Sequence, residues 1–409
     1  MTELSTAPPP SAGVEFPLPR TCPYAPPEGY ARFRDTDPLV RVTLYNGTSA
    51  WLVTRLAEAQ DLLTDERLSA NSRSEGYPFV VARMEGMKEQ PPSFIGMDAP
   101  HHTVHRRMLI PDFSVKRMRA IRPYIEQIVN GLIDRMLEKG EPVDLVKEFA
   151  LPVPSIVIAE LLGVPEEDDD FFVEQSSLMI QATTPGAARD AGAQLAGYVN
   201  KLISKKEQEQ GDPEEQGLIG RLTLEQLADG SLARQDLVQM ALLLLVAGHQ
   251  TTSSMISLSV ATLLQHPDQL AALKADPSGL AAAVEELLRF LSITDVSAMR
   301  VATADIPVGD QLIRAGEGVV VVSTLVNRDE RAFPDPDRLD LTRDARSHMS
   351  FSHGSHQCLG QNLARLEVEV ALGVLFERIP TLRLAAPMES LSVRGAGDVQ
   401  GVNELPVTW

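Results

Sequence analysis

The chain has 409 residues, of which 44% are hydrophobic and 23% charged, the composition of a globular protein rather than of a disordered or fibrous one. With 37 Lys and Arg against 56 Asp and Glu, the formal net charge is −19. Such a surface repels nucleic-acid phosphates and anionic lipid headgroups, so we expect no nucleic acid and no membrane among its partners.

The sequence predicts a cytoplasmic protein. Met1–Gly13 is polar and rich in proline, and it lacks the basic and apolar regions of a signal peptide. The most apolar runs, Met240–Ala247 and Val319–Val322, are far shorter than the roughly 20 residues that span a bilayer. Two cysteines, Cys22 and Cys358, are too few for a disulfide scaffold, and we expect no bridge between them.

Hydrophobic patterning predicts a mainly α fold with small β-sheets, in a single large domain over residues 29–409 that follows a loose Pro-rich tail, residues 1–28. Val40–Val53 has the β-branched content of two strands, with Asn46-Gly47 as the hairpin turn. The further predicted elements are helices over Ala57–Thr64, Asp144–Gly163 and Ala187–Gln208, a solvated loop or frayed helix end at Lys205–Gln216, helices over Ser231–Gln265 and Val284–Leu291, strands and turns over Val301–Val322, and a last helix ending at Arg378.

The longest predicted helix, Ser231–Gln265, is apolar on all faces in its middle, which is typical of a helix buried inside a large core. His266-Pro267 ends it.

The strongest chemical signal is the segment Phe351-Ser352-His353-Gly354-Ser355-His356-Gln357-Cys358-Leu359-Gly360. Apolar residues recur at helical spacing behind it, which places Cys358 just before a helix N-terminus, where unpaired N–H groups favour a thiolate. A thiolate suits a soft metal centre or a nucleophile. Gly354 permits a tight loop, Gly360 permits a flat body to approach the backbone, and Phe351 can shield the sulfur. For Cys358 alone, an inert buried cysteine is the simpler interpretation; the complete string is not expected by chance.

In this string the sequence resembles the cytochrome P-450 family of haem-thiolate monooxygenases, and three further segments follow the family's order from about Val40 onward. The resemblance implies the cytochrome P-450 fold, with the long central helix over a haem b, and Cys358 as the axial ligand of the haem iron. A thiolate ligand pushes electron density onto the iron and favours O–O cleavage.

Glu286-Leu287-Leu288-Arg289 places a carboxylate and a guanidinium at i and i+3, the spacing of an ion pair. Alone, this pattern is equally that of a surface salt bridge. The family adds an arginine from a later irregular stretch, here Arg338, so the resemblance implies a structural triad of Glu286, Arg289 and Arg338 that supports the cysteine loop.

Ala247-Gly248-His249-Gln250-Thr251-Thr252 interrupts the central helix in this interpretation, because Gly248 weakens it and threonine hydroxyls bend it. The family usually has an acid before the threonine, where this chain has Gln250. Gln250 can orient water, but it cannot supply a proton at neutral pH. We therefore expect water or another acid to feed protons toward Thr251.

Histidines cluster in His101–His105 and His348–His356, the segments that flank a haem edge in the family. Burying haem propionates in an acidic protein requires local cations, and the resemblance assigns this role to His102, Arg106, Arg300 and His356. A zinc site at the first cluster is the disfavoured alternative, because a mixture of histidine and arginine suits anions better.

The sequence also predicts a basic patch on the cysteine side, where an acidic ferredoxin can dock. Its expected members are His105, Arg106, Arg107, Arg343, Arg346, His353 and Arg365. The chain has no flavin or iron–sulfur cysteine motif, so we expect electrons to come from NAD(P)H through ferredoxin and ferredoxin reductase.

Family geometry places the substrate among mostly apolar residues, which suits a lipophilic molecule. The expected pocket residues are Leu243, Val246, Ala247, Ile293, Val296 and Ser297, within a site that also includes the loop Ser74–Ile95 as a lid, the stretch to Met299 and the turn near Asp398–Val402. Arg73 and Arg83 flank the lid and are interpreted mainly as surface charges.

The leading hypothesis is a monomeric monooxygenase that hydroxylates a lipophilic natural product or foreign compound with O2. Epoxidation or oxidative coupling by the same haem stays open, as does a haem sensor or carrier without turnover. A zinc or structural helical protein is the remaining alternative.

Overall fold

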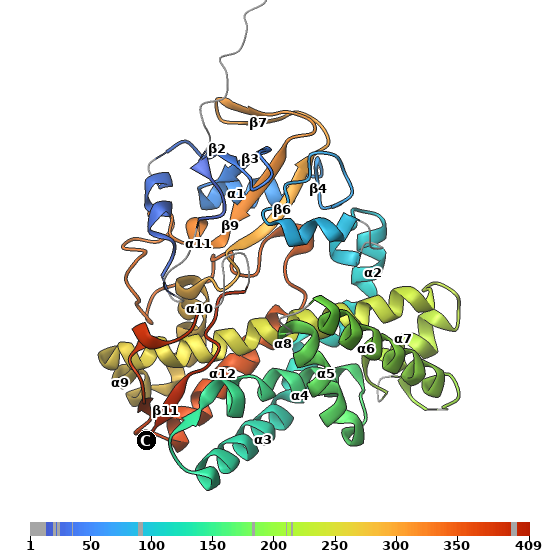
Figure 1. Ribbon diagram of the computed structural model, residues 1–409, viewed down its shortest axis with the longest axis vertical. Coiled ribbons are helices and arrows are strands. Elements are labelled where there is room, and N and C mark those ends of the chain that lie inside the picture. The colour runs from blue at the N-terminus through green and yellow to red at the C-terminus, as the bar shows by residue number, and fades with distance from the viewer. Residues whose placement is uncertain are drawn as a thin grey trace, which may run out of the picture.

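The computed structural model describes residues 14–18, 22, 25–34, 36–88, 93–181, 185–209, 211–213, 216–393 and 399–409. Its helices gather in one part of the molecule and its largest sheet in another (Figure 1). The helices are α1 Leu56–Thr64, α2 His101–Leu109, α3 Val115–Lys139, α4 Pro152–Leu162, α5 Asp169–Gln181, α6 Pro185–Lys206, α7 Gly217–Leu222, α8 Arg234–Gln265, α9 Pro267–Ala275, α10 Leu280–Leu291, α11 Ser323–Val326 and α12 Gln361–Arg378.

The strands are β1 Val14–Glu15, β2 Leu39–Thr43, β3 Ser49–Val53, β4 Leu68–Ser69, β5 Val143–Asp144, β6 Val296–Ala302, β7 Ile306–Val308, β8 Gln311–Ile313, β9 Gly318–Val322, β10 Arg383–Leu384 and β11 Pro406–Thr408. Within the described ranges they form a six-stranded sheet in the order β1-β2-β3-β9-β6-β4, a three-stranded sheet β10-β11-β5 and the hairpin β7-β8. Strand β9 is buried at every position, since it lies inside the sheet and pairs with both β3 and β6.

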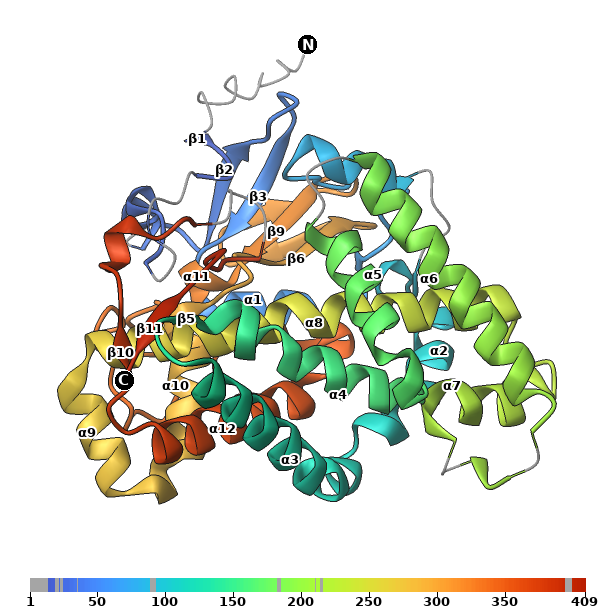
Figure 2. The same cartoon turned by 60° about the horizontal axis from the view of Figure 1, so that its bottom comes forward.

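Helix α8 crosses the helical part, with α4, α10 and α12 packed against it (Figures 1 and 2). Of the helices described, it alone has the length and composition that could cross a membrane, but 61% of its most apolar stretch is buried inside the protein. It is therefore placed as a core helix, as its pattern predicted. Two smaller apolar clusters lie around the sheet.

Several predicted elements differ from the structure. Residues 1–28 are not simply a loose tail, because β1 pairs with β2 and Phe16 is 3% exposed; residues 1–13 lie outside the described ranges. The helix predicted at Asp144–Gly163 is strand β5, one turn of π-helix and then α4. The segment Lys205–Gln216, predicted as a solvated loop or a frayed helix end, begins with the last two residues of α6, which agrees with the second alternative. Helix α8 continues through Ala247–Thr252 without the predicted interruption.

Candidate functional site

The loop before α12 holds Cys358 in a fixed position. The Cys358 N–H donates to the Phe351 carbonyl at 2.8 Å, which folds the loop back on itself. Gly354 has a φ of 72°, and a Cβ there would lie 2.3 Å from the Leu63 carbonyl oxygen, so only glycine fits. The guanidinium of Arg365 lies 4.5 Å from the centre of the Phe351 ring and fixes the other side of the loop.

The Cys358 side chain is exposed, although protein atoms surround it closely. That crowding raises the pKa of the thiol, while the Gly360 N–H and the charges of Arg106 and Arg365 lower it by less. In the absence of a cation at the sulfur, desolvation thus outweighs the N–H group and the two guanidinium charges, and the thiolate expected at this helix N-terminus stays a prediction for the iron-bound sulfur. Binding a cation at this exposed sulfur would favour the thiolate. Cys22 is likewise a free thiol.

Cationic and imidazole side chains gather beside this loop. The rings of His102 and His356 stack with their centroids 3.9 Å apart. Burial first, and then the charges of Arg300, His102 and Arg106, lower the pKa of His356 to about 3. Burial and the charges of Arg106 and Arg300 likewise lower the pKa of His102. Arg106 reaches from α2 to the Gln357 carbonyl at 2.5 Å. The structure thus brings together all four predicted partners of the propionates.

This arrangement fits an anionic, flat group with an iron at its centre. The Nε2 atom of His102 is buried and has no hydrogen-bond partner within the described part of the chain, as expected of a donor whose acceptor is a carboxylate of a bound molecule. A Cβ at Gly360 would meet only Phe113, at 3.9 Å, so nothing in the protein itself requires glycine there. Among the described residues no set of three His, Cys, Asp or Glu side chains could hold a metal ion by itself.

The middle of α8 opens onto free space although the helix is otherwise buried. Val246 is 39% exposed, and Ala247 beside it is also exposed. The Thr251 hydroxyl donates to the Ala247 carbonyl at 2.6 Å, the local bond that threonine was expected to make. α8 continues through Gly248, where an added Cβ would touch Ile158 at an ordinary 3.7 Å. The middle of α8 therefore presents an exposed apolar surface, which is where the predicted substrate would make contact.

The remaining predicted pocket residues are spread over several elements. Leu243 is half-buried on α8, Val296 and Ser297 are half-buried on β6, and Ile293 is 9% exposed. Gln400 donates from its N–H to the Ile293 carbonyl at 2.7 Å, which joins the C-terminal turn to this stretch. The predicted lid carries two 3₁₀ turns, Ala82–Lys88 and Phe94–Gly96. Residues 89–92 and 394–398, with Asp398, and the side chain of Arg83 lie outside the described parts.

The predicted triad has a different third member. Arg289 donates to Glu286 at 2.7 and 2.8 Å, and both side chains are fully buried. Arg343, not Arg338, is the second guanidinium on Glu286, at 3.2 Å. Arg338 is 68% exposed and pairs with Asp340. The sequence offers several arginines after Phe333, and only the course of the chain decides which of them turns inward.

The predicted basic patch is largely neutralised. Arg343 is held by Glu286, Arg346 by Asp344 and Arg365 by Glu285, while Arg106 faces inward. His105, Arg107 and His353 remain. The structure adds exposed Lys116 and Arg119 on α3, next to exposed Val104, Ile110 and Val115. This surface, which we call the α2–α3 face, adjoins the cysteine loop because Asn362 donates to the Phe113 carbonyl.

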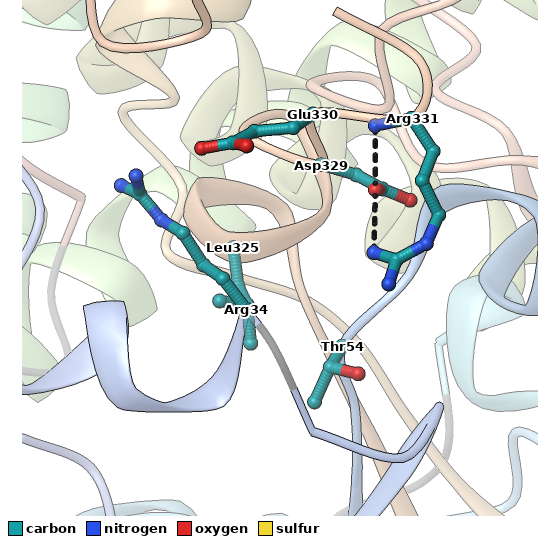
Figure 3. Close-up of a pocket in the computed structure, with 6 residues that line it drawn as sticks. All are labelled: Arg34, Thr54, Leu325, Asp329, Glu330 and Arg331. Carbon is teal, nitrogen blue, oxygen red and sulfur yellow. Dashed lines mark hydrogen bonds and ion pairs between the residues drawn. The ribbon is translucent and has the colours of Figure 1, made fainter.

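Two other features lie outside the predicted site. A polar cavity of about 300 Å³ lies near Arg34 and Thr54, where Arg331 pairs with Asp329 (Figure 3). Since Arg34 in turn pairs with Asp337, the arginines at this cavity are already matched by carboxylates. The second feature is Glu367 on α12, a fully buried acid that the sequence analysis missed. A carboxylate on the apolar side of the last helix is the signal that would have found it.

Comparison with known proteins agrees with this site. A family model described as Cytochrome P450 matches residues 35–276 and 279–380. The chain is 52% identical over 410 residues to a vitamin D3 dihydroxylase of Streptomyces griseolus, covering 100% of both chains. It is 50% identical over 409 residues to a pentalenic acid synthase of Streptomyces avermitilis, again covering 100% of both.

Solved structures extend the agreement to the fold. The crystal structure of cytochrome P450 MoxA from Nonomuraea recticatena superimposes with a TM-score of 0.92 at 46% identity, covering 97% of this chain and 99% of that one. Family, fold and the surroundings of Cys358 lead to one conclusion: the chain belongs to the cytochrome P450 family and is an oxidoreductase, a haem- and O2-dependent monooxygenase of lipophilic small molecules.

Proposed function

We propose that this protein takes two electrons from a ferredoxin and hydroxylates a lipophilic small molecule bound beneath α8. The observation that carries the proposal is the juxtaposition of an exposed Cys358 sulfur with the cluster His102, Arg106, Arg300 and His356. When bound, haem supplies the activation of O2 for insertion into a C–H bond.

In this proposal each residue of the chain has a separate task. Cys358 ligates the iron, and the loop bond to Phe351 holds the sulfur in place. His102, Arg106, Arg300 and His356 hold the two carboxylates. Gly360 leaves room for the flat ring. Gly248 and Ala247 keep the middle of α8 free of bulk, and Thr251 with Gln250 orients water and a proton at the oxygen side.

The substrate is proposed as a largely apolar molecule, of the class to which the names vitamin D3 and pentalenic acid point. In this proposal Leu243, Val246 and Ala247 on α8, together with Ile293 before β6 and Val296 and Ser297 on β6, supply apolar contact and one hydroxyl. A site of this kind selects by shape, with few polar contacts to direct the substrate. Product analysis separates hydroxylation from epoxidation or oxidative coupling.

The electron donor is proposed as an acidic ferredoxin reduced by NAD(P)H through a ferredoxin reductase. It docks on the α2–α3 face, where none of Arg107, Lys116 and Arg119 has an ion-pair partner among the residues described. Exposed apolar side chains between these cations provide the contact area that charge alone lacks. The protein is proposed to be a cytoplasmic monomer.

The test is spectroscopic and then chemical. The reduced, carbon-monoxide-treated protein should show the strongly red-displaced absorption band of thiolate-ligated haem, and Cys358→Ser should abolish it. Ferredoxin, its reductase, NAD(P)H and a lipophilic compound that shifts the absorption spectrum should then give an oxygenated product. A normal band in the serine variant would refute the ligand, and a substrate that binds but is never oxidised would support a carrier.

A further inference from the structure

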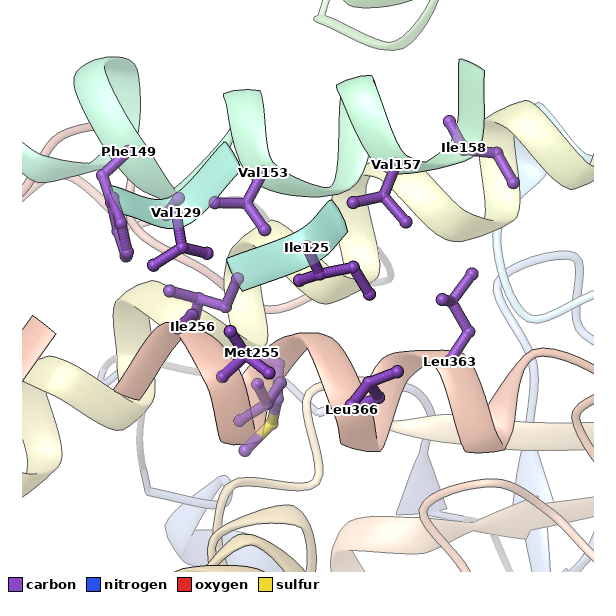
Figure 4. Close-up of a cluster of buried hydrophobic side chains, with 14 of the residues drawn as sticks. Ile125, Val129, Phe149, Val153, Val157, Ile158, Met255, Ile256, Leu363 and Leu366 are labelled. Carbon is purple, nitrogen blue, oxygen red and sulfur yellow. The ribbon is translucent and has the colours of Figure 1, made fainter. Parts of the chain in front are cut away.

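Arg365 is a member of the predicted basic patch whose surroundings the docking hypothesis does not explain. It lies on α12, the helix that follows Cys358, and nearby Leu363 and Leu366 pack into the apolar cluster shown in Figure 4. This packing fixes the rotation of α12 about its axis, and with it the direction in which Arg365 leaves the helix. The Arg365 side chain contacts the cysteine loop and is only 27% exposed, so it offers a docking partner little surface.

Arg365 is held by a bidentate ion pair. Its Nε donates to Oε1 of Glu285 on α10 at 2.5 Å, and its Nη2 donates to Oε2 of the same carboxylate at 3.1 Å. Its Nη1 donates to the side chain of Gln361 at 2.9 Å. A planar guanidinium bound through all three nitrogens has one orientation, so the charge of Arg365 stays in a fixed place.

Glu285 is held from its other side by a histidine. The Nε2 atom of His348 lies 3.0 Å from Oε2 of Glu285, and its Nδ1 accepts a hydrogen bond from the Ser350 N–H at 3.1 Å. Because Nδ1 accepts, the ring proton is on Nε2 and is donated to Glu285. Burial would raise the pKa of Glu285, but the hydrogen bonds from His348 and Arg365 outweigh burial and lower it to about 2. Glu285 is therefore ionised at neutral pH.

Phe351 connects the guanidinium to the sulfur. The guanidinium carbon of Arg365 lies 4.5 Å from the centre of the Phe351 ring, and the Phe351 carbonyl accepts the Cys358 N–H at 2.8 Å. Burial raises the pKa of the Cys358 thiol, and Arg365 is one of two cations whose charge lowers it, whereas Glu285 does not shift it. Of the two members of the ion pair, the sulfur therefore senses mainly the cation.

We propose that Arg365, oriented by Glu285 and His348, sets the reduction potential of the haem by keeping a positive charge beside the Cys358 sulfur. The inference rests on the proposed ligation of the iron by Cys358, which it deepens. A cation in this place withdraws electron density from the thiolate and favours the state that holds one more electron. Glu285 limits the effect, because its negative charge opposes that of Arg365. Both act through the sulfur and are positioning residues.

The step concerned is the uptake of the first electron. The ferredoxin is oxidised by one electron, ferric haem becomes ferrous haem, and no bond is made or broken. A higher haem potential makes this transfer more favourable, so the charge of Arg365 offsets part of the electron donation from the thiolate.

The test is spectroelectrochemistry of the haem-loaded protein. At a fixed applied potential, Arg365→Leu should lower the ratio of ferrous to ferric haem about three- to tenfold, where tenfold corresponds to about 59 mV for one electron. Glu285→Gln should raise the ratio about threefold, because it removes the opposing charge and leaves Arg365 bound to Gln361 and Phe351.

Arg378→Leu is the matched control. Arg378 is also on α12, is 29% exposed and pairs with Asp134, but it lies roughly 20 Å further along the helix at 1.5 Å per residue. Its removal should leave the potential unchanged. Arg365→Lys keeps the charge and should stay closer to the parent than Arg365→Leu.

The infrared stretch of carbon monoxide on the reduced haem is a second readout, because a more strongly donating sulfur weakens the C–O bond. It should move to lower frequency in Arg365→Leu and to higher frequency in Glu285→Gln, while both variants keep the red-displaced band.

Opposite shifts in these two variants support the inference. Shifts in the same direction overturn it, because a purely structural brace would disturb the loop alike from either side. If Arg365→Leu does not fold, a parental potential in Glu285→Gln is sufficient to overturn it. A parent protein without the red-displaced band overturns the proposed function instead.

Discussion

Arg289 donates two parallel hydrogen bonds to Glu286, from Nε to Oε2 at 2.7 Å and from Nη2 to Oε1 at 2.8 Å, and both side chains are fully buried. Arg289 also donates to the carbonyls of Asn327 and Pro336, each at 2.9 Å. One guanidinium thus fastens α10 to two points of the long irregular segment that leads to the cysteine loop. Both partners of this buried ion pair are needed for the stability of the fold, because removing one would leave the charge of the other buried and uncompensated.

Breaking this pair should destabilise the whole fold. We expect Arg289→Leu to lower the free energy of unfolding by about 3–5 kcal/mol, because Glu286 is left buried without its partner. Urea denaturation followed by circular dichroism measures the change. A loss below about 1 kcal/mol would contradict the structural role of the pair.

The third member of the triad can be decided by a matched pair of variants. Arg343→Ala should cost about 1–3 kcal/mol, because Arg343 is a tenth exposed and bonds both Glu286 and the Pro334 carbonyl at 2.5 Å. Arg338→Ala should change stability by less than about 0.5 kcal/mol, since its pair with Asp340 is on the surface. The reverse order in the same denaturation assay would restore the original assignment to Arg338.

Glu285 should make stability depend on acid pH. Burial alone would raise its pKa, but hydrogen bonds from His348 and Arg365 and the charge of Arg365 outweigh burial and lower the pKa to about 2. A carboxyl with a lowered folded-state pKa stabilises the fold above its unfolded pKa of about 4.5, and this contribution is lost as the pH falls toward 2.

We therefore expect Glu285→Gln to be less stable than the parent by about 1–2 kcal/mol at pH 7, a value reduced by solvent screening at the partly exposed arginine. The difference should shrink between pH 5 and pH 3. Denaturation curves across this range measure it, and a constant difference would show that the carboxylate charge is not the cause.

Arg300 should control how firmly the haem is held. Arg300 is largely desolvated, which lowers the pKa of its guanidinium, so an anion beside it gains more than one at the surface would. We expect Arg300→Leu to release haem to an acceptor apoprotein about tenfold faster, the loss of one charged hydrogen bond. Arg314→Leu, which removes an exposed arginine from the turn between β8 and β9, is the control and should release haem at the parental rate.

The α2–α3 face should govern reduction. Removing two cations with Arg107→Ala and Lys116→Ala should slow reduction by ferredoxin about three- to tenfold at low salt. The control Lys201→Ala with Lys205→Ala removes the same charge from exposed positions on α6 and should leave the rate unchanged. Stopped-flow reduction at increasing ionic strength measures the effect, and a rate independent of salt would exclude electrostatic docking here.

Much of the site could be predicted from local sequence. Three short segments carry the prediction, because the residue types and their spacing within each segment indicate its role. They are the string from Phe351 to Gly360, the pair Glu286 and Arg289, and the helix around Thr251. The apolar middle of α8 predicted a buried helix for the same reason, since no other environment accepts a helix that is apolar on all faces. The family, the fold class and the identity of Cys358 as the candidate ligand follow from these segments.

The tertiary structure decided what depends on residues far apart in the chain. Sequence spacing does not show which arginine reaches Glu286 or which arginines of the predicted basic patch already have a carboxylate partner. It also does not show whether desolvation of the Cys358 sulfur outweighs the groups that stabilise its thiolate. Each of these depends on all the neighbours that the fold brings together. Glu367 is the clearest case, because its burial and its bond to Thr252 exist only where α12 packs on α8. Local patterns fix which chemical groups are present, whereas packing fixes their solvation and partners, and these determine when a group holds a charge or a proton.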